Sequence, residues 1–297
     1  MLLQQILNGL VVGGTFAVFA LGFTLLFGVN HILNMAYGSV FMWGAFAGLY
    51  TATALQAPFV VSLLVGMLAG GVLSVLLDLI AFRPLRRRQA PEFSYILTSI
   101  GASIALVALA QKASNTTVWQ FPSDTFPVVI YEFLGLQVQL LQLIIVACAA
   151  LLVAALITMI YHSGMGRRIR CVAHSEQTAQ LLGINAQAVN IQVFFISGAL
   201  AGFAGVLIGL AFNSVHFLMG EPFLMRAFVI IILGGLGSIA GALVGGMFIG
   251  VVQTLAYAYI SSAAAEAIVF VILFFVILIR PTGLFGRPGA VMRVQRQ

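Results

Sequence analysis

The chain has 297 residues, of which 62% are hydrophobic and 7% are charged, and its formal net charge is +6. A water-soluble protein of this length needs a far more polar surface, so the composition excludes a soluble fold. Apolar runs of about eighteen or more residues recur along the chain, which is typical of transmembrane helices. We therefore predict an all-α, polytopic bundle of transmembrane helices. The net positive charge does not indicate binding to nucleic acid, because the basic residues form short clusters between apolar runs.

The apolar runs predict about 8–9 spans in a single transmembrane domain, residues 1–297. The first run has no basic n-region, since the first Lys or Arg of the chain is Arg83, so we expect a retained helix and not a signal peptide. The predicted spans cover about residues 5–28, 36–56, 59–81, 93–111, 138–161, 190–212, 223–236, 238–259 and 262–280.

Charge sets the expected orientation of these spans. One basic cluster follows the third span and another follows the fifth, so both lie on one side, which the positive-inside rule makes cytoplasmic. The loop 111–133 and the N-terminus are then external, and the basic tail 281–297 is cytoplasmic. The tail returns to the cytoplasm only if residues 223–259 cross the membrane twice. The two clusters are Arg83, Arg86, Arg87, Arg88 and Arg167, Arg168, Arg170.

Two segments interrupt the apolar pattern and predict broken or re-entrant helices. One is "LFGVNHILNMAYGS", residues 26–39, and the other is the Gly-rich stretch 234–246. All eight prolines fall at or outside the predicted span ends, so we expect glycine to make the interruptions. G-x-x-x-G pairs are frequent, for example Gly44/Gly48 and Gly198/Gly202, and predict close helix contacts.

The sequence lacks the residues that energy coupling and catalysis need. Its single lysine, Lys112, is not part of a phosphate-binding loop, so the chain has no nucleotide site of its own. The four histidines are widely separated and no metal-ligand spacing occurs, so we predict no metal, no cofactor, no catalytic residue and no enzyme activity. Acidic residues fall near span ends and are expected to be interfacial anchors, among them Asp78, Glu221 and Glu266. An autonomous channel or an ion-coupled carrier is expected to have ionisable residues inside the membrane, and no acidic residue falls in the middle of a predicted span.

A polar island, residues 164–185, stands out in this apolar chain. Ser175 is a suitable N-cap, residues 176–182 can form about two helical turns, and Gly183 stands where a C′ glycine ends a helix. The apolar residues of this segment are Ala179, Leu181, Leu182 and Ile184, and the polar ones include Gln177, Thr178 and Gln180. The pattern fits a helix that rests on lipid and equally a helix that docks on a cytoplasmic partner.

Three stretches resemble the branched-chain amino acid ABC permease family of the LivH type. They are "FGVNHILNMAYGSVFMWGAF", "GRRIRCVAHSEQTAQLLGIN" followed by "FFISGALAGFAGVL", and "LGGLGSIAGALVGG". They occur in the order that the family has, and the apolar spans between them fit. Family members commonly have His where this chain has Tyr37.

The resemblance implies a permease domain that works with other subunits in the inner membrane of a bacterium. These are a second homologous permease, two cytoplasmic ATPases that bind the ATP, and an external substrate-binding protein. It implies that about 162–190 is a coupling loop and that polar residues of the first interruption line the pathway. The implied pathway residues are Asn30, Asn34, Tyr37 and Ser39, and the implied coupling residues are Gly166, Arg167, Glu176, Ala179, Leu182 and Gly183.

The sequence does not identify the transported solute. Branched-chain or other hydrophobic amino acids fit the resemblance best, while relatives of the family also handle urea and short-chain amides. An autonomous channel or secondary carrier is the remaining alternative.

Overall fold

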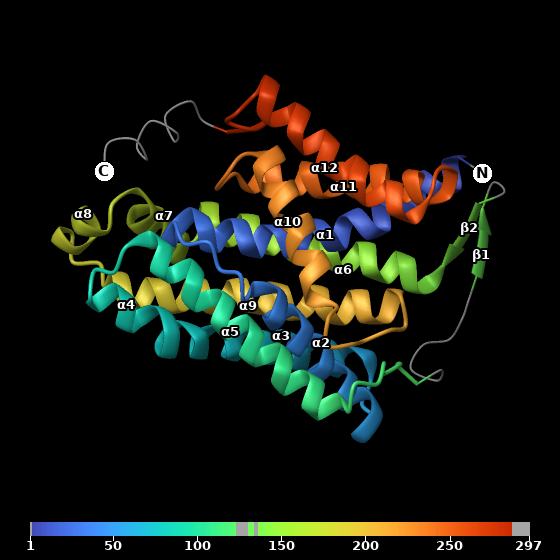
Figure 1. Ribbon diagram of the computed structural model, residues 1–297, viewed down its shortest axis with the longest axis horizontal. Helices are drawn as coiled ribbons and strands as arrows, with labels where there is room; N and C mark the ends of the chain where they lie inside the picture. Colours follow the sequence, from blue (N-terminus) through green and yellow to red (C-terminus); the bar gives the residue numbers. More distant parts are fainter. Residues whose placement is uncertain (1, 123–129, 134–135, 287–297) are drawn as a thin grey trace. The chain divides into compact units, whose positions relative to one another are not determined.

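The computed structural model describes residues 2–122, 130–133 and 136–286. Within them, seven helices are long and apolar enough to cross a membrane, which confirms the polytopic helical fold. Figure 1 shows the helices and a small hairpin. The elements are α1 (Leu2–Asn30), α2 (Tyr37–Ala54), α3 (Phe59–Leu77), the π-helical turn η1 (Asp78–Phe82), α4 (Arg83–Arg87), α5 (Glu92–Ser114), β1 (Ile130–Phe133), β2 (Leu136–Gln139), α6 (Leu140–His162), α7 (Gly164–His174), α8 (Glu176–Leu181), α9 (Ala186–Ala211), α10 (Gly220–Gly234), α11 (Ile239–Tyr259) and α12 (Ser262–Ile279).

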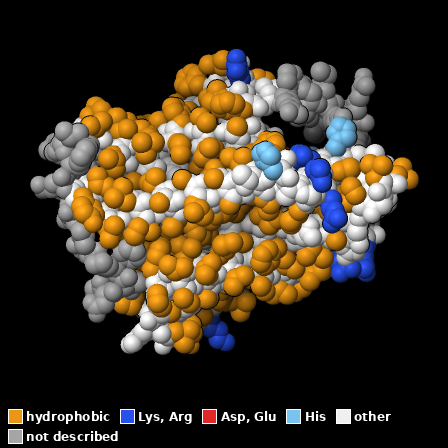
Figure 2. Space-filling model, turned by 180° about the vertical axis from the view of Figure 1, so that it is seen from behind, with side chains coloured by type: hydrophobic (Ala, Val, Ile, Leu, Met, Phe, Trp, Pro, Cys, Tyr) orange, Lys and Arg blue, Asp and Glu red, His pale blue; other side chains and the backbone are white. Residues whose placement is uncertain are grey.

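Each of the nine predicted spans corresponds to a helix. Seven of them are the candidate membrane spans, and the other two are α2 and the 15-residue α10, which is too short to cross a bilayer unaided. Figure 2 shows a face made mostly of hydrophobic side chains, which suits a surface that meets lipid.

The chain forms two compact units of interleaved segments. Unit 1 comprises Met1–Thr24, Val128–Ala154 and Met225–Gln297, and unit 2 comprises Leu25–Pro127 and Ala155–Leu224. Neither unit is one continuous stretch of chain. That residues 1–297 act as a single permease domain stays a prediction.

Unit 2 is built on α2, α3 and α9, which meet through glycine. A Cβ on Gly70 would lie 2.9 Å from the Cα of Gly202, and a Cβ on Gly44 or Gly66 would also strike the backbone of α9 or α2. These backbones approach more closely than any side chain allows, which confirms the role expected of the G-x-x-x-G pairs. The contacts run in the same order along α2 and α9 and in the opposite order along α3, so α2 is parallel to α9 and α3 is antiparallel.

In unit 1, glycines likewise allow the backbones of α1 and α11 to approach closely. A Cβ on Gly9 would lie 2.7 Å from the Cα of Val251, and a Cβ on Gly13 would lie 2.8 Å from the Cα of Met247. The predicted interruption near residue 234 is also observed, because Gly235 and Gly237 have φ of +100° and +80° between α10 and α11. The amides of Leu284 and Phe285 then donate to the carbonyls of Leu233 and Gly234, at 2.8 and 3.0 Å, and so bind the start of the tail to this turn.

Three expectations about local structure were wrong. Residues 83–87 are not loop, because the third helix continues through η1 and α4 to Arg87, with Pro84 inside it. The loop 111–133 is not wholly irregular, because it contains β1, which pairs with β2 as an antiparallel hairpin. The polar island forms two helices, α7 and α8, where one was expected. Of the loop 111–133 and the tail 281–297, residues 123–129 and 287–297 lie outside the described residues.

Candidate functional site

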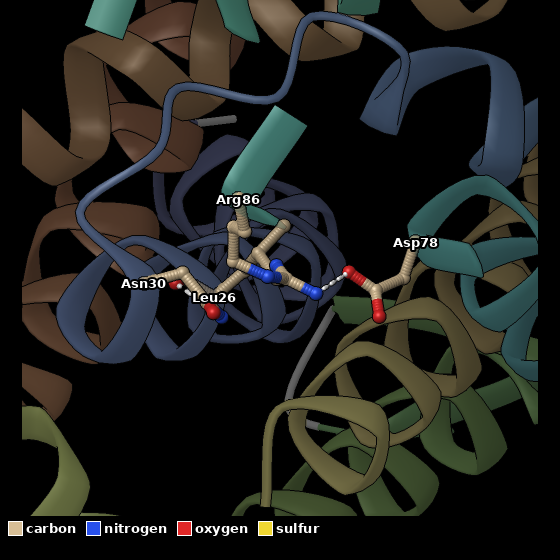
Figure 3. Close-up of polar contacts among 4 residues, drawn as sticks. All are labelled: Leu26, Asn30, Asp78 and Arg86. Atoms are coloured by element: carbon tan, nitrogen blue, oxygen red, sulfur yellow. Dashed lines mark hydrogen bonds and ion pairs between the residues drawn. The ribbon is translucent and has the colours of Figure 1, made fainter. Parts of the chain in front are cut away.

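The first interruption separates α1 from α2, as predicted, at residues 31–36. His31 ends α1 with φ of +53°, so a histidine and not a glycine makes this break. The Asn30 side chain donates back to the carbonyl of Leu26 at 3.5 Å (Figure 3). Asn34 is fully buried, its Oδ1 accepts from the amide of Ala36 at 3.0 Å, and its Nδ2 has no hydrogen-bond partner among the described residues.

The next two predicted pathway residues bind neighbouring helices. The Tyr37 hydroxyl is buried and donates to the carbonyl of Ser197 on α9 at 3.0 Å. The Ser39 hydroxyl shares a 2.8 Å hydrogen bond with that of Ser103 on α5. The four predicted pathway residues therefore gather at the start of α2 within unit 2, and their role in transport stays a prediction.

These contacts also fix the depth at which α2 begins. Ser197 lies roughly halfway along α9, and Gly198 packs against Gly70 and Ser74 near the middle of the long helix Phe59–Arg87. Since α3 and α9 are candidate spans, their middles lie near the bilayer centre. The segment 31–36 therefore brings the chain to mid-depth before α2 starts.

The start of α10 lies against the start of α2. A Cβ on Gly38 would be 2.5 Å from the carbonyl oxygen of Gly220, so the two backbones touch. The rings of Phe41 and Phe223 stack beside this contact, with centroids 4.9 Å apart. Two helix N-termini therefore meet at mid-depth in unit 2.

The polar island begins with α7, which sequence reasoning missed. The Ser163 hydroxyl caps it by accepting from the amide of Gly166 at 3.0 Å. Gly166 is buried, and a Cβ there would collide with the carbonyls of Met159 and Ile160. Ile169 and Val172 face inward, whereas Arg167 is exposed. This one-sided pattern over residues 164–174 could have indicated an amphipathic helix.

The second helix of the island, α8, has the caps that the sequence predicts. Ser175 Oγ accepts from the amide of Thr178 at 3.2 Å, and Gly183 ends the helix with φ of +78°. Ala179 is fully buried, so it packs against the chain itself. Leu181 and Leu182 are 89% and 69% exposed. The predicted coupling residues thus separate into supporting residues such as Ala179 and outward-facing ones such as Leu182.

The two basic clusters belong to the same end of unit 2. Figure 1 shows α4, α7 and α8 together at the left end of the long helices of this unit. Arg83–Arg87 lies on α4, and Arg167, Arg168 and Arg170 lie on α7. This is the arrangement that the positive-inside rule requires of cytoplasmic segments.

An ion pair that sequence reasoning did not find lies beside α4. Asp78 was expected to be an interfacial anchor, but its side chain is fully buried and pairs with Arg86 (Figure 3). The Arg86 guanidinium also lies 5.8 Å from the centre of the Phe194 ring on α9. Phe82 packs against Phe194 and against Tyr95 of α5. The acidic residue is buried because the helix continues past it.

Comparison with known proteins decides what kind of protein has this architecture. Residues 5–278 match the family model described as "Branched-chain amino acid transport system / permease component". The chain belongs to this permease family. No solved structure is significantly similar to it.

Relatives named as permeases match this family member over nearly its whole length. It is 31% identical to the high-affinity branched-chain amino acid transport system permease protein LivH of Escherichia coli, with 96% of each chain covered. The identity to BraD of Pseudomonas aeruginosa is also 31%, again with 96% of each chain covered. A probable LivH of Methanocaldococcus jannaschii is 26% identical over 95% of this chain and 92% of its own. The chain is therefore a multi-pass membrane permease of this family.

Proposed function

We propose that this permease is the transmembrane subunit of an ABC importer for branched-chain or other hydrophobic amino acids. The observation that carries the proposal is the exposed leucine pair of α8. Leu181 is the last residue of the six-residue α8 and Leu182 is its C-cap, at the end of unit 2 that holds the basic clusters. Exposed apolar residues on a short helix serve as anchors in a groove of a partner protein.

The partner at this helix is a cytoplasmic ATPase. Because the sequence has no nucleotide-binding loop of its own, the energy for transport in this proposal comes from a subunit that binds ATP. We assign one ATPase to each of two permeases, with an external binding protein that delivers the solute. The second permease is homologous or a second copy of this chain. In this arrangement the N-terminus is external and the C-terminus is cytoplasmic.

Asn30, Asn34, Tyr37 and Ser39 line or support the pathway in this proposal. Their position at mid-depth, where α2 and α10 begin, supports it. In several transporter folds, interrupted helices supply polar groups at the membrane midplane. No cofactor is bound by the permease itself.

Purification of the tagged protein from native membranes, followed by mass spectrometry, tests the assembly. We expect two ATPases and a second permease to copurify. The complex with its binding protein is then reconstituted into liposomes, and ATP-driven uptake of leucine, urea and a short amide is compared. Uptake of urea or the amide, without uptake of leucine, would show that this solute and not an amino acid is the substrate. Solute flux through the chain alone, without ATP, would overturn the importer.

A further inference from the structure

The crossing of α2 and α10 puts a carboxylate at mid-depth. Glu221 follows Gly220, whose carbonyl lies against Gly38, and Tyr37 is level with the middle of α9. Glu221 was expected to lie at a span end, as an interfacial anchor. The contact of Gly220 with Gly38 instead favours a position level with the middle of α9, because α10 begins beside the start of α2.

The Glu221 side chain is exposed on the surface of the chain. In the part of the chain that the structure describes, the two ion pairs are Arg86–Asp78 and Arg226–Glu266, so Glu221 has no basic partner there. A carboxylate that faces lipid at this depth is costly, and ionisable groups inside membranes face a protein interior or a water-filled cavity. The exposed face at Glu221 therefore borders water or another subunit.

A second polar group, just before the start of α2, lacks a partner. Asn34 is fully buried, its Oδ1 is held by the amide of Ala36 at the start of α2, and its Nδ2 has no acceptor among the described residues. A buried donor without an acceptor is unfavourable and is uncommon in native proteins. The N-terminal end of α2 also favours negative charge. Asn34 Nδ2 and this helix end together suit an anionic acceptor that the chain does not supply.

We propose that the crossing of α2 and α10 is a subsite for a zwitterionic α-amino acid in transit. The Glu221 carboxylate binds the ammonium group, and Asn34 Nδ2 with the start of α2 binds the carboxylate. This inference rests on the proposed function and names the chemistry that the pathway recognises. Urea and short amides have no charges to satisfy both groups. Since Asn34 is covered in this structure, its contact with solute requires movement of residues 31–36.

The Glu221→Gln variant tests the ammonium contact in the complete reconstituted transporter. We expect its initial rate of leucine uptake to fall by about tenfold or more, because the amide still accepts from the ammonium group but lacks the negative charge that strengthens this contact. Glu221→Asp should retain part of the rate. Glu92→Gln is the matched control, since Glu92 is also an exposed carboxylate in the first turn of a helix, α5.

Asn34→Asp tests the carboxylate contact without changing the size of the side chain. It keeps the acceptor for Ala36 and replaces the free donor by an acceptor, so leucine uptake per correctly folded, reconstituted complex should fall about tenfold or more. If both Glu221→Gln and Asn34→Asp match Glu92→Gln in uptake, the subsite is wrong and the importer proposal stands. If the wild-type transporter takes up no leucine, the importer proposal itself fails and the subsite with it.

Cysteine labelling tests whether water reaches Glu221, independently of uptake. In a Cys148→Ala/Cys171→Ala background, Glu221→Cys should react with a charged methanethiosulfonate, and leucine should slow the reaction. Ile104→Cys, at a 66% exposed position on the apolar α5, should not react. A Glu221→Cys that stays unlabelled with and without ATP would overturn the aqueous subsite.

Discussion

Asp78 and Arg86 form a buried ion pair within one continuous helix, eight residues apart in sequence (Figure 3). In a regular α-helix, residues with this spacing lie about 80° apart around the axis. The π-helical turn Asp78–Phe82 lies between them and accommodates one extra residue. Asp78 and Arg86 then behave like residues seven apart, which share a helix face after two turns. The π-turn is therefore what allows the pair to form.

Arg86→Ala should destabilise the protein by about 3–5 kcal/mol, because it leaves the Asp78 carboxylate buried without its partner. The measurement is thermal unfolding of the purified permease in detergent. Arg87→Ala is the control, since Arg87 is the exposed neighbour on the same helix. The double variant Asp78→Asn/Arg86→Ala should be more stable than Arg86→Ala alone. Equal stability of Arg86→Ala and Arg87→Ala would show that the pair is not structural.

Gly202→Ala should separate α9 from α3, because its Cβ would strike the backbone of Gly66. Overpacking of this kind costs about 1–3 kcal/mol or more where the neighbour is backbone. Thermal unfolding and the yield of monodisperse protein report the effect. Gly101→Ala is the control, since a Cβ at Gly101 meets nothing within 4 Å. If both variants unfold at the same temperature, close packing at Gly202 does not stabilise unit 2.

Hydrophobic runs and glycine spacing predicted the spans well, because burial in lipid demands apolar residues and close packing demands small ones. The break after Asn30 and the turn at Gly235 were also found from the sequence. What these patterns did not show was how far a helix continues past its apolar part. Arg83–Arg87 is helical, and Arg86 pairs there with the buried Asp78, a contact that depends on tertiary packing.

The candidate site was also predicted only in part, because some of its features are local in sequence and others depend on tertiary packing. Ser175 and Gly183 act locally, so their roles as caps followed from sequence alone. The depth of Glu221 did not follow from sequence, because it depends on the contact of Gly38 with Gly220. These two glycines lie far apart in the sequence. The burial of Ala179 and the exposure of Leu181 likewise depend on how α8 packs.

Leu181→Asp and Leu182→Asp should each lower ATP-driven uptake more than tenfold in the reconstituted transporter, as expected when an apolar anchor of an interface is replaced by a charge. Both side chains are exposed, so insertion and thermal stability of the permease should not change. Gln177→Asp adds the same charge to an exposed polar position of α8 and is the control. Normal uptake and normal copurification of the ATPase with both leucine variants would contradict docking at α8.

Gly183→Ala should weaken the end of α8 by about 1 kcal/mol, because φ of +78° is unfavourable for a residue with a Cβ. Steric collision is not the cause, since a Cβ at Gly183 meets nothing within 4 Å. Gly183→Asn should cost less, because asparagine adopts this conformation more readily than alanine. The capping bond from the amide of Ile184 to the carbonyl of Ala179, at 3.0 Å, reports the change through hydrogen exchange. Exchange at Ile184 should be faster in Gly183→Ala than in Gly183→Asn. Equal rates in these variants and the wild type would mean that α8 is fixed by the packing of Ala179 and not by its cap.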